Sequence, residues 1–288
     1  MVCISAFMFL VAPLNASAEA ESEPQISDHP SSVDYRAPFT VAGRVGDSSG
    51  SEVVLQRRFP HGESWMNVAR STTRESGRVA MNLDGTRYTA EYRLKSSGLT
   101  SEKVRIPVKP KLTLRLKRAD VMKGRQAVVR GALRPTWSER QATLKSRVNG
   151  RWKVINEVNL ADGHFKAKLP VESAGKRRIR VVFERDVSNT YAHAGEVLRV
   201  HGKSMATWYG PGFFGNRTAC GETYHRDLLG VAHRTLPCGT KVSVLYRGRS
   251  VKVPVVDRGP YGHANWDLTE ETAQRLRFSG RETVGVLH

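Results

Sequence analysis

The sequence lacks a hydrophobic run long enough to be a clear membrane span. Its most apolar stretch, Ile4 to Leu14, is short and is interrupted by Pro13, whereas a spanning helix needs about 20 apolar residues. Ala16-Ser17-Ala18 follows, in the small-x-small pattern at which secretory signal peptides are cleaved. We therefore expect residues 1–18 to be a signal peptide and the mature chain to have no transmembrane segment; an uncleaved anchor is the alternative. Because Met1 to Phe9 contains no Lys or Arg, we expect the true start codon to lie upstream.

Acidic residues are also scarce. The chain has 27 Asp and Glu against 46 Lys and Arg, which gives a formal net charge of +19. Such a field attracts polyanions in a salt-dependent way, and nucleic acid, anionic cell-envelope polymers and acidic membrane surfaces are the candidates. Export favours envelope polymers, and no recognised nucleic-acid-binding module is visible, so we expect no nucleic-acid partner. The hydrophobic fraction of 39% excludes a largely disordered chain.

Cysteine is the third scarce residue. Of three cysteines, Cys3 would be removed with the signal peptide, which leaves Cys220 and Cys238. An even pair in an oxidising compartment favours a disulfide over a metal site or a reactive thiol. Closing a loop of that size stabilises a fold by roughly 3 kcal/mol. Two free buried thiols are the alternative.

The length of 288 residues suits two or three domains. Residues 19–35 are acidic, rich in Ser and Pro and without periodicity, which predicts a disordered linker. Short runs with period-two alternation follow, as at Arg87 to Lys95 and Arg177 to Phe183, and predict half-buried antiparallel strands. Asn149-Gly150 predicts a tight hairpin turn between two such runs.

This β-rich stretch repeats itself. Gly62-Glu63-Ser64-Trp65 corresponds to Gly150-Arg151-Trp152, each followed by an alternating strand. The spacing suits small β-sandwiches, so we predict two tandem immunoglobulin-like domains over residues 36–110 and 111–201. Basic clusters such as Lys176-Arg177-Arg178 are individually typical of solvated strand faces. As a set they lead to the hypothesis that these sandwiches adhere to anionic wall polymers.

The last region, residues 202–288, contains a helix signal and three unusual motifs. Thr269 can cap a helix over Glu270 to Arg277, with acidic residues in its first turn and basic residues in its last. Each motif places an ionisable side chain near Gly or Pro, which allow the sharp turns that present reactive groups at strand ends. The motifs are Thr218-Ala219-Cys220-Gly221-Glu222, Ala232-His233-Arg234-Thr235-Leu236-Pro237 and Val256-Asp257-Arg258-Gly259-Pro260.

Together with Ala206-Thr207-Trp208-Tyr209-Gly210 and Asp267-Leu268-Thr269, these motifs resemble the rare lipoprotein A family, which is related to expansins and barwin-like domains. The resemblance covers about Met205 to Val286. It implies that a mainly β chain ends in a double-psi β-barrel. It also implies lytic transglycosylase action on peptidoglycan glycan strands, at the MurNAc–GlcNAc linkage. The residues that match the active site of the family are Glu222, His233 and Asp257.

Asp257 is the candidate general acid and base, with Glu222 and His233 orienting or tuning it. It follows an apolar strand, so we expect its carboxylate at the barrel rim. Cleavage needs a proton on the leaving oxygen, and the family chemistry then uses the C6 hydroxyl of muramic acid, which gives a 1,6-anhydro product. Arg258 favours an ionised carboxylate and so opposes the acid role. The structural alternatives are a turn cap for Asp257, a buried histidine for His233 and a surface carboxylate for Glu222.

Flat aromatic rings offer apolar area to sugar faces, although core packing is an alternative for Trp208. The candidate substrate-binding residues are Trp208, Tyr209, Arg258 and Tyr261. The spacing of His225, His233 and His263 with Asp257 matches no standard zinc pattern. We therefore expect neither a metal nor another cofactor.

Two features of Gram-negative family members are not visible. No lipobox cysteine follows the apolar run, because Cys3 precedes it, and no glycan-binding repeat domain follows Val286. We therefore expect a secreted, wall-associated enzyme whose partners are peptidoglycan strands and, through its basic sandwiches, anionic wall polymers. The alternative is a non-catalytic, expansin-like protein that binds and loosens wall polysaccharide.

Overall fold

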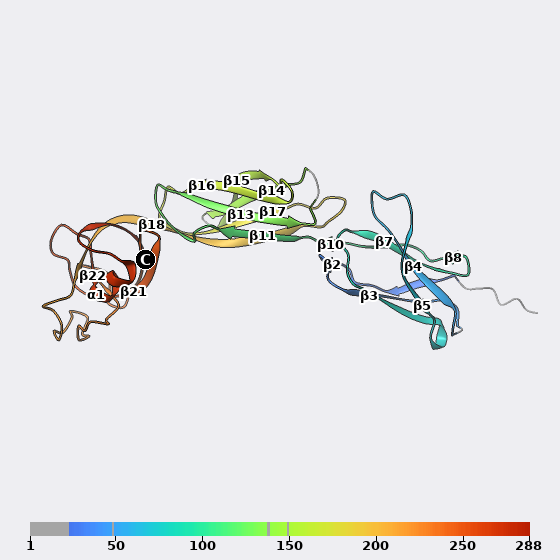
Figure 1. Ribbon diagram of the computed structural model, residues 1–288, viewed down its shortest axis with the longest axis horizontal. Helices are drawn as coiled ribbons and strands as arrows, with labels where there is room; N and C mark the ends of the chain where they lie inside the picture. The colour runs from blue at the N-terminus through green and yellow to red at the C-terminus, as the bar shows by residue number, and fades with distance from the viewer. Residues whose placement is uncertain (1–22, 48, 137–138, 149) are drawn as a thin grey trace, which may run out of the picture. The chain divides into compact units, whose positions relative to one another are not determined.

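The fold is that of a computed structural model, which describes residues 23–288 apart from 48, 137–138 and 149. The predicted signal peptide, residues 1–18, lies outside the described residues. Strands dominate the described part of the chain (Figure 1), which confirms the mainly β class. In that part, no helix has the length and apolar content needed to cross a membrane. The chain divides into two compact units, each of which is described by itself.

Unit 1 contains the described residues up to Ser31 together with Pro38–Asp84 and Ala90–Ile106. One sheet has the strand order β1-β3-β6, and the other has β5-β4-β7-β8 with β9 beside β7. Tyr92 and Leu94 of β7 are buried, as the period-two pattern there predicts. The elements are β1 (Gln25–Asp28), β3 (Phe39–Arg44), β4 (Glu52–Arg58), β5 (Met66–Thr72), the 3-10 turn η1 (Glu75–Gly77), β6 (Arg78–Leu83), β7 (Ala90–Ser96), β8 (Leu99–Thr100) and β9 (Val104–Ile106).

The prediction of a disordered linker over residues 19–35 is wrong for its described part. Strand β1 pairs antiparallel with β3, and β2 (Val33–Asp34) pairs parallel with β10 (Val108–Lys109). Strand β1 lies at the edge of its sheet and its side chains are mostly exposed. Pairing at such an edge uses backbone groups, so no alternating apolar pattern marks the strand in the sequence.

Unit 2 contains Ser32–Ala37, Gly85–Thr89 and Pro107–His288. It begins with two sheets, β11-β13-β16 and β15-β14-β17-β18, with β12 parallel to β18. Leu133 of the first sheet and Leu144 of the second belong to one buried core. The strands are β11 (Lys111–Leu116), β12 (Asp120–Met122), β13 (Gln126–Arg134), β14 (Gln141–Val148), β15 (Arg151–Asn159), β16 (His164–Pro170), β17 (Gly175–Phe183) and β18 (Ala192–Tyr209).

The hairpin predicted at Asn149-Gly150 is present. Strands β14 and β15 pair antiparallel, with Val148 opposite Arg151. Gly150 has a φ of +77°, a conformation that tight hairpin turns require and that glycine adopts easily. Asn149 itself lies outside the described residues.

Strand β18 leads from these sheets into a closed barrel without interruption at residues 201 and 202. Around the barrel the order is β18-β22-β19-β21-β20-β23, and β23 pairs back to β18. The pairs β18–β22 and β19–β21 are parallel and the others antiparallel. Apolar side chains such as Val231, Val255 and Leu268 fill the interior. The remaining strands are β19 (Val231–Ala232), β20 (Lys241–Tyr246), β21 (Arg249–Asp257), β22 (Trp266–Thr269) and β23 (Glu282–Leu287).

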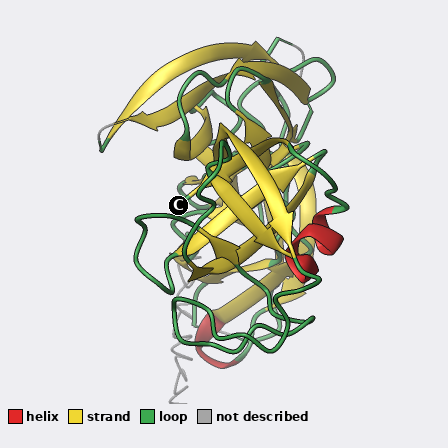
Figure 2. Ribbon diagram, turned by 90° about the vertical axis from the view of Figure 1, so that its left-hand side faces the viewer, coloured by secondary structure: helices red, strands yellow, loops and turns green. Residues whose placement is uncertain are grey.

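One helix, α1 (Glu270–Leu276), lies against the flank of the barrel strands (Figure 2). The Thr269 side chain accepts a hydrogen bond from the Thr272 N–H, so Thr269 caps the helix as predicted. The helix ends one residue earlier than the sequence indicates. Arg277 adopts a left-handed conformation, with φ of 54°, and terminates it.

Candidate active site

Two parallel strands bring His233 and Asp257 to the same edge of the barrel. Strand β19 ends at Ala232 and β21 ends at Asp257, and Ala232 is the register partner of Asp257. His233 follows Ala232 directly. The His233 N–H donates a hydrogen bond of 3.1 Å to the Asp257 carbonyl. Gly259, at a φ of +120° that favours glycine, turns the chain away just beyond Asp257. The sequence prediction that Asp257 lies at a barrel rim therefore agrees with the register.

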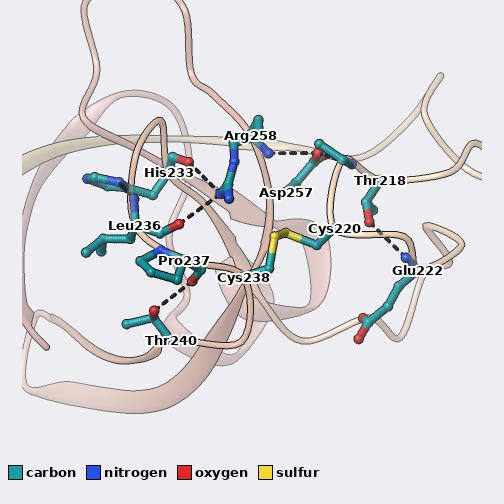
Figure 3. The surroundings of a disulfide bond; sticks show 11 residues. Thr218, Cys220, Glu222, His233, Leu236, Pro237, Cys238, Thr240, Asp257 and Arg258 are labelled. Atoms are coloured by element: carbon teal, nitrogen blue, oxygen red, sulfur yellow. Dashed lines mark hydrogen bonds between the residues drawn. A yellow bond between two sulfur atoms is a disulfide. The ribbon is translucent and has the colours of Figure 1, made fainter.

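The Asp257 carboxylate is half-buried and accepts two backbone hydrogen bonds at one oxygen. Its Oδ1 accepts from the Ala219 N–H and from the Arg258 N–H, both at 2.8 Å. Both bonds fix the orientation of the carboxylate at the end of β21. The first of them also attaches the loop that carries Cys220 to the barrel edge (Figure 3).

Cys220 and Cys238 form the predicted disulfide, with their Cα atoms 5.7 Å apart. The bond joins the loop of Glu222 to the loop that follows His233. On the first loop, the Glu222 N–H donates to Thr218 Oγ1 at 3.2 Å. The Glu222 side chain is exposed, and Figure 3 shows its carboxylate pointing away from Asp257.

His233 lies on the other side of Asp257 from Glu222 (Figure 3). Its Nδ1 accepts hydrogen bonds from the N–H groups of Thr235 and Leu236, at 3.2 and 3.1 Å. Burial lowers the pKa of the imidazole, and the nearby charges of His288, Arg234 and Arg258 lower it further. The neutral ring with an acceptor at Nδ1 carries its proton on Nε2, so His233 can offer an N–H to a ligand. The structure thus brings Glu222, His233 and Asp257 to the two loops that the disulfide joins and to the strand end beside them. Their side chains do not converge on one point (Figure 3).

Arg258 makes contacts that its sequence assignment to substrate binding did not include. Its Nη1 donates to the carbonyl oxygens of Leu236 and His233, at 2.9 and 3.3 Å. These bonds hold the His233 loop in place and occupy one end of the guanidinium. Arg258 therefore has a structural task within the site.

The three aromatic candidates differ in exposure. Tyr261 is 85% exposed and Trp208 is 38% exposed, so both rings present area to solvent. Tyr209 is half-buried and stacks on Tyr224, with ring centroids 4.8 Å apart. Burial raises the pKa of Tyr209, and the negative charges of Asp257 and Asp267 add to the rise. Tyr209 is therefore a neutral hydroxyl close to both carboxyl groups.

Asp267 is the site residue whose role the sequence did not reveal. Ala232 on β19 is the register partner of Asp257 on one side and of Asp267 on the other, and Thr207 of β18 is the next partner of Asp267. Register partners project to the same face of a sheet. On β22 the two neighbours of Asp267, Trp266 and Leu268, belong to the barrel core, so Asp267 faces outward from the barrel wall. On β21 the register is irregular between Val255 and Asp257, and it is the charge of Asp257, which acts on Asp267, that marks the two carboxyl groups as neighbours.

Two strand spacings separate the Cα atoms of Asp257 and Asp267, or roughly 10 Å. The Asp267 Oδ1 is buried and has no hydrogen-bond partner among the described residues. Burial raises the pKa of Asp267 to about 6; a hydrogen bond from Thr207 opposes the rise and the charge of Asp257 adds to it. The signal in the sequence was a single acid between Trp266 and Leu268, inside an apolar strand. In the described part of the chain, no group of three or more His, Cys, Asp or Glu side chains is arranged to hold a metal ion.

Comparison with known proteins places this region in a family. The family described as "Lytic transglycolase" matches residues 201–288. A probable endolytic peptidoglycan transglycosylase RlpA of Synechocystis is 51% identical over 91 residues, which are 31% of this chain and 28% of the relative. The endolytic peptidoglycan transglycosylase RlpA of Campylobacter jejuni is 52% identical over 85 residues, 28% of this chain and 31% of the relative. That of Pseudomonas aeruginosa is 45% identical over 105 residues, 35% of this chain and 30% of the relative.

Residues 201–288 are therefore a double-psi β-barrel of the lytic transglycosylase class. Within that class they belong to the RlpA-like family, as the sequence motifs indicated. The matches extend over about a third of the length of these three relatives.

Proposed function

We propose that this protein is a secreted, wall-associated lytic transglycosylase. It cleaves the MurNAc–GlcNAc linkage of peptidoglycan and releases 1,6-anhydro products. The names of its relatives support the reaction class and the substrate. The observation that carries the proposal is that Asp257 and Asp267 are both register partners of Ala232, so that two carboxyl groups in contrasting surroundings lie on neighbouring strands.

Such a pair suits acid–base chemistry. Burial, with a smaller contribution from the charge of Asp257, raises the pKa of Asp267 to about 6, so Asp267 keeps a proton at a higher pH than an ordinary aspartate does. Asp257, the half-exposed member, delivers the proton to the glycosidic oxygen, and Asp267 acts through it as a positioning residue.

The reaction then balances without water. The bond between C1 and the leaving oxygen breaks as that oxygen takes the proton from Asp257. The C6 hydroxyl of the muramic acid forms the new bond to C1, and its proton returns to the Asp257 carboxylate. One residue thus serves as acid and then as base. His233, with its proton on Nε2, and Glu222, exposed on the disulfide-held loop, orient the glycan, and the rings of Trp208 and Tyr261 pack on sugar faces.

The rest of the chain holds the enzyme on the wall. We assign the sheet pairs over residues 36–110 and 111–201 to tandem immunoglobulin-like sandwiches that adhere to anionic wall polymers. Their surplus of Lys and Arg supports this role. Retention on purified walls should fall when residues 36–200 are deleted, and unchanged retention would dismiss the role.

A second candidate function is expansin-like loosening without cleavage. It is favoured by one observation, namely that the Glu222 and His233 side chains do not converge on Asp257 (Figure 3). Both candidates predict binding to purified sacculi. Only the enzyme releases 1,6-anhydro muropeptides.

Digestion of purified sacculi followed by mass spectrometry separates the two. We expect the wild type to release 1,6-anhydro muropeptides and Asp257→Asn to lose about 100-fold or more of the rate, as removal of a general acid does. Asparagine keeps an oxygen for the Ala219 N–H, so the loop stays attached. Asp227→Asn, which removes an exposed carboxylate of the same barrel, is the matched control and should retain full activity. Wild-type protein that binds sacculi but releases no anhydro product would establish the non-catalytic function.

A further inference from the structure

A cavity of about 410 Å³ lies where barrel strands β20, β21 and β23 meet strands β12, β17 and β18 within unit 2. Neither Asp257 nor Asp267 is among its lining residues. Its size is that of a site for a small organic ligand. The lining is polar and mostly basic. The lining residues that matter here are Lys176, Arg199, Lys241, Lys252, Asp120 and Ser243.

The one carboxylate of this group, Asp120, is fully engaged. Arg199 donates to it twice, from Nε to Oδ1 at 2.8 Å and from Nη2 to Oδ2 at 2.6 Å. His201 Nε2 lies 2.9 Å from Oδ1. These partners, Arg199 first, hold the pKa of Asp120 below its usual value. Asp120 therefore neutralises Arg199 and has no free oxygen to pair with the lysines.

The three lysines carry uncompensated charge. Within the described residues, the ammonium groups of Lys176, Lys241 and Lys252 have neither an ion-pair nor a hydrogen-bond partner. Lys176 is directly opposite Arg199 on the neighbouring strand. Lys241 lies diagonally from Lys252 on one face of the β20–β21 hairpin, because Ser243 is the partner of Lys252. Because Asp120 neutralises Arg199, the repulsion between like charges is concentrated in the Lys241–Lys252 pair.

The frame that holds these lysines is tightly packed. His201 of β18 is fully buried. A Cβ on Gly285 of β23 would come within 2.7 Å of the Cβ of His201, so only glycine fits there. Strand β18 itself continues from one side of the cavity into the barrel. The strands that carry these lysines are therefore held together by a close-packed junction, and the lysine side chains extend from it into solvent around the cavity.

We propose that this cavity binds the phosphodiester units of an anionic wall polymer. Lysine ammonium groups act as point charges that suit phosphate oxygens, and the Ser243 hydroxyl supplies a neutral donor between Lys241 and Lys252. An anion bound between Lys241 and Lys252 relieves the repulsion between them. The inference rests on the proposed attachment to wall polymers and gives that attachment a defined site.

The cavity is also close to the candidate active site. His288 lines it, the His288 ring lies 6.1 Å from the ring of Trp266, and the Trp266 ring lies 4.3 Å from that of His233. A polymer bound in the cavity therefore lies near the end of the barrel where His233 follows strand β19. Because the two sites are neighbours, the protein can bind a charged polymer in the cavity while its candidate active site binds an adjacent glycan strand.

Calorimetric titration of the full chain tests the site without any need for catalysis. The probes are a phosphodiester-linked glycerol phosphate oligomer, inorganic phosphate and a single-stranded DNA of equal phosphate number, all at one salt concentration. The test variant is the triple Lys176→Gln, Lys241→Gln and Lys252→Gln. The control triple, Lys203→Gln, Arg277→Gln and Arg281→Gln, removes the same charge from exposed positions outside the cavity and outside the sandwiches. Thermal melts establish that each variant folds.

We expect the cavity triple to lose about tenfold or more of its affinity for the oligomer, whereas the control triple changes by about twofold or less. The oligomer should raise the Tm of the wild type but not that of the cavity triple, because a ligand stabilises only the fold that binds it. Equal losses in the two triples, or no loss in either, would overturn the site. Tighter binding of the DNA, abolished by the cavity triple, would overturn the wall polymer as its ligand. Binding of inorganic phosphate as tight as that of the oligomer would also overturn it.

Discussion

Asp120 and Asp267 are two half-buried aspartates of the same unit in opposite electrostatic situations. Asp120, at the junction with the barrel, has two Arg199 bonds and one contact with His201, and its pKa is lowered. Asp267, on the barrel wall, has a buried oxygen without a partner, and its pKa is raised to about 6. A carboxylate whose oxygens all accept hydrogen bonds or ion pairs, such as that of Asp120, has a structural role. A carboxylate left short of partners costs stability, which proteins tolerate mainly at functional sites.

The largest effect should follow from removing the proton-holding partner of Asp257. Asp267→Asn should lower the rate of 1,6-anhydro release by about 100-fold, and the pH–rate curve should lose its inflection near pH 6. A purely structural role would leave the shape of that curve unchanged. The same variant should be as stable as the wild type at pH 7 or more stable, because it replaces a poorly solvated charge with a neutral amide. If Asp267→Asn were less stable than the wild type and kept its pH–rate profile, Asp267 would have the same structural role as Asp120.

Asp120→Asn should have the opposite signature. It leaves the Arg199 guanidinium and the buried His201 with a weakened partner, and we expect it to lower the free energy of unfolding by roughly 3 kcal/mol. Urea denaturation measures this. Activity per folded molecule should be unchanged, since the residue does not contact Asp257 or Asp267. Loss of activity without loss of stability would give Asp120 a functional role.

The smallest effect is the dependence of stability on pH. The pKa of Asp120 is lowered on folding, so its contribution is present above the unfolded pKa and is lost as the pH falls through the folded pKa, below 3.8. The pKa of Asp267 is raised from 3.8 to about 6, so its contribution is present below pH 3.8 and is lost as the pH rises through 6. We expect the second loss to be roughly 1 to 2 kcal/mol, because the partial exposure of the side chain screens its charge.

Urea unfolding of the wild type and Asp267→Asn between pH 4 and 8 isolates the Asp267 contribution. The two curves should diverge as the pH rises, with the variant the more stable above pH 6. Parallel curves would mean that Asp267 is solvated in the folded state as it is in the unfolded chain.

The sequence was informative where function and local structure coincide. Asp257 and His233 stand beside Gly and Pro turns, and short motifs were enough to predict their place at strand ends. The Cys220–Cys238 pair was the even pair expected in an exported chain, and it forms the disulfide. The Thr269 cap and the Gly150 turn are local for the same reason. Their boundaries agree with the structure to within a residue or so.

What the sequence did not reveal depends on register between distant strands. The place of Asp267 beside Asp257 follows from two pairings of Ala232, which no local pattern encodes. The basic cavity combines Lys176 with Lys252, residues of different sheets that β18 and β12 bring together. The edge strand β1 pairs through its backbone, and its sequence therefore looked like a linker.

The central claim is that Asp267, beside Asp257, keeps its proton up to about pH 6. NMR titration of ¹³C-labelled carboxyl groups measures this for each aspartate in the folded protein. The account predicts that the Asp267 carboxyl titrates with a midpoint near pH 6, while Asp120 stays ionised throughout the range from pH 4 to 8. A midpoint for Asp267 at or below pH 4 would contradict it.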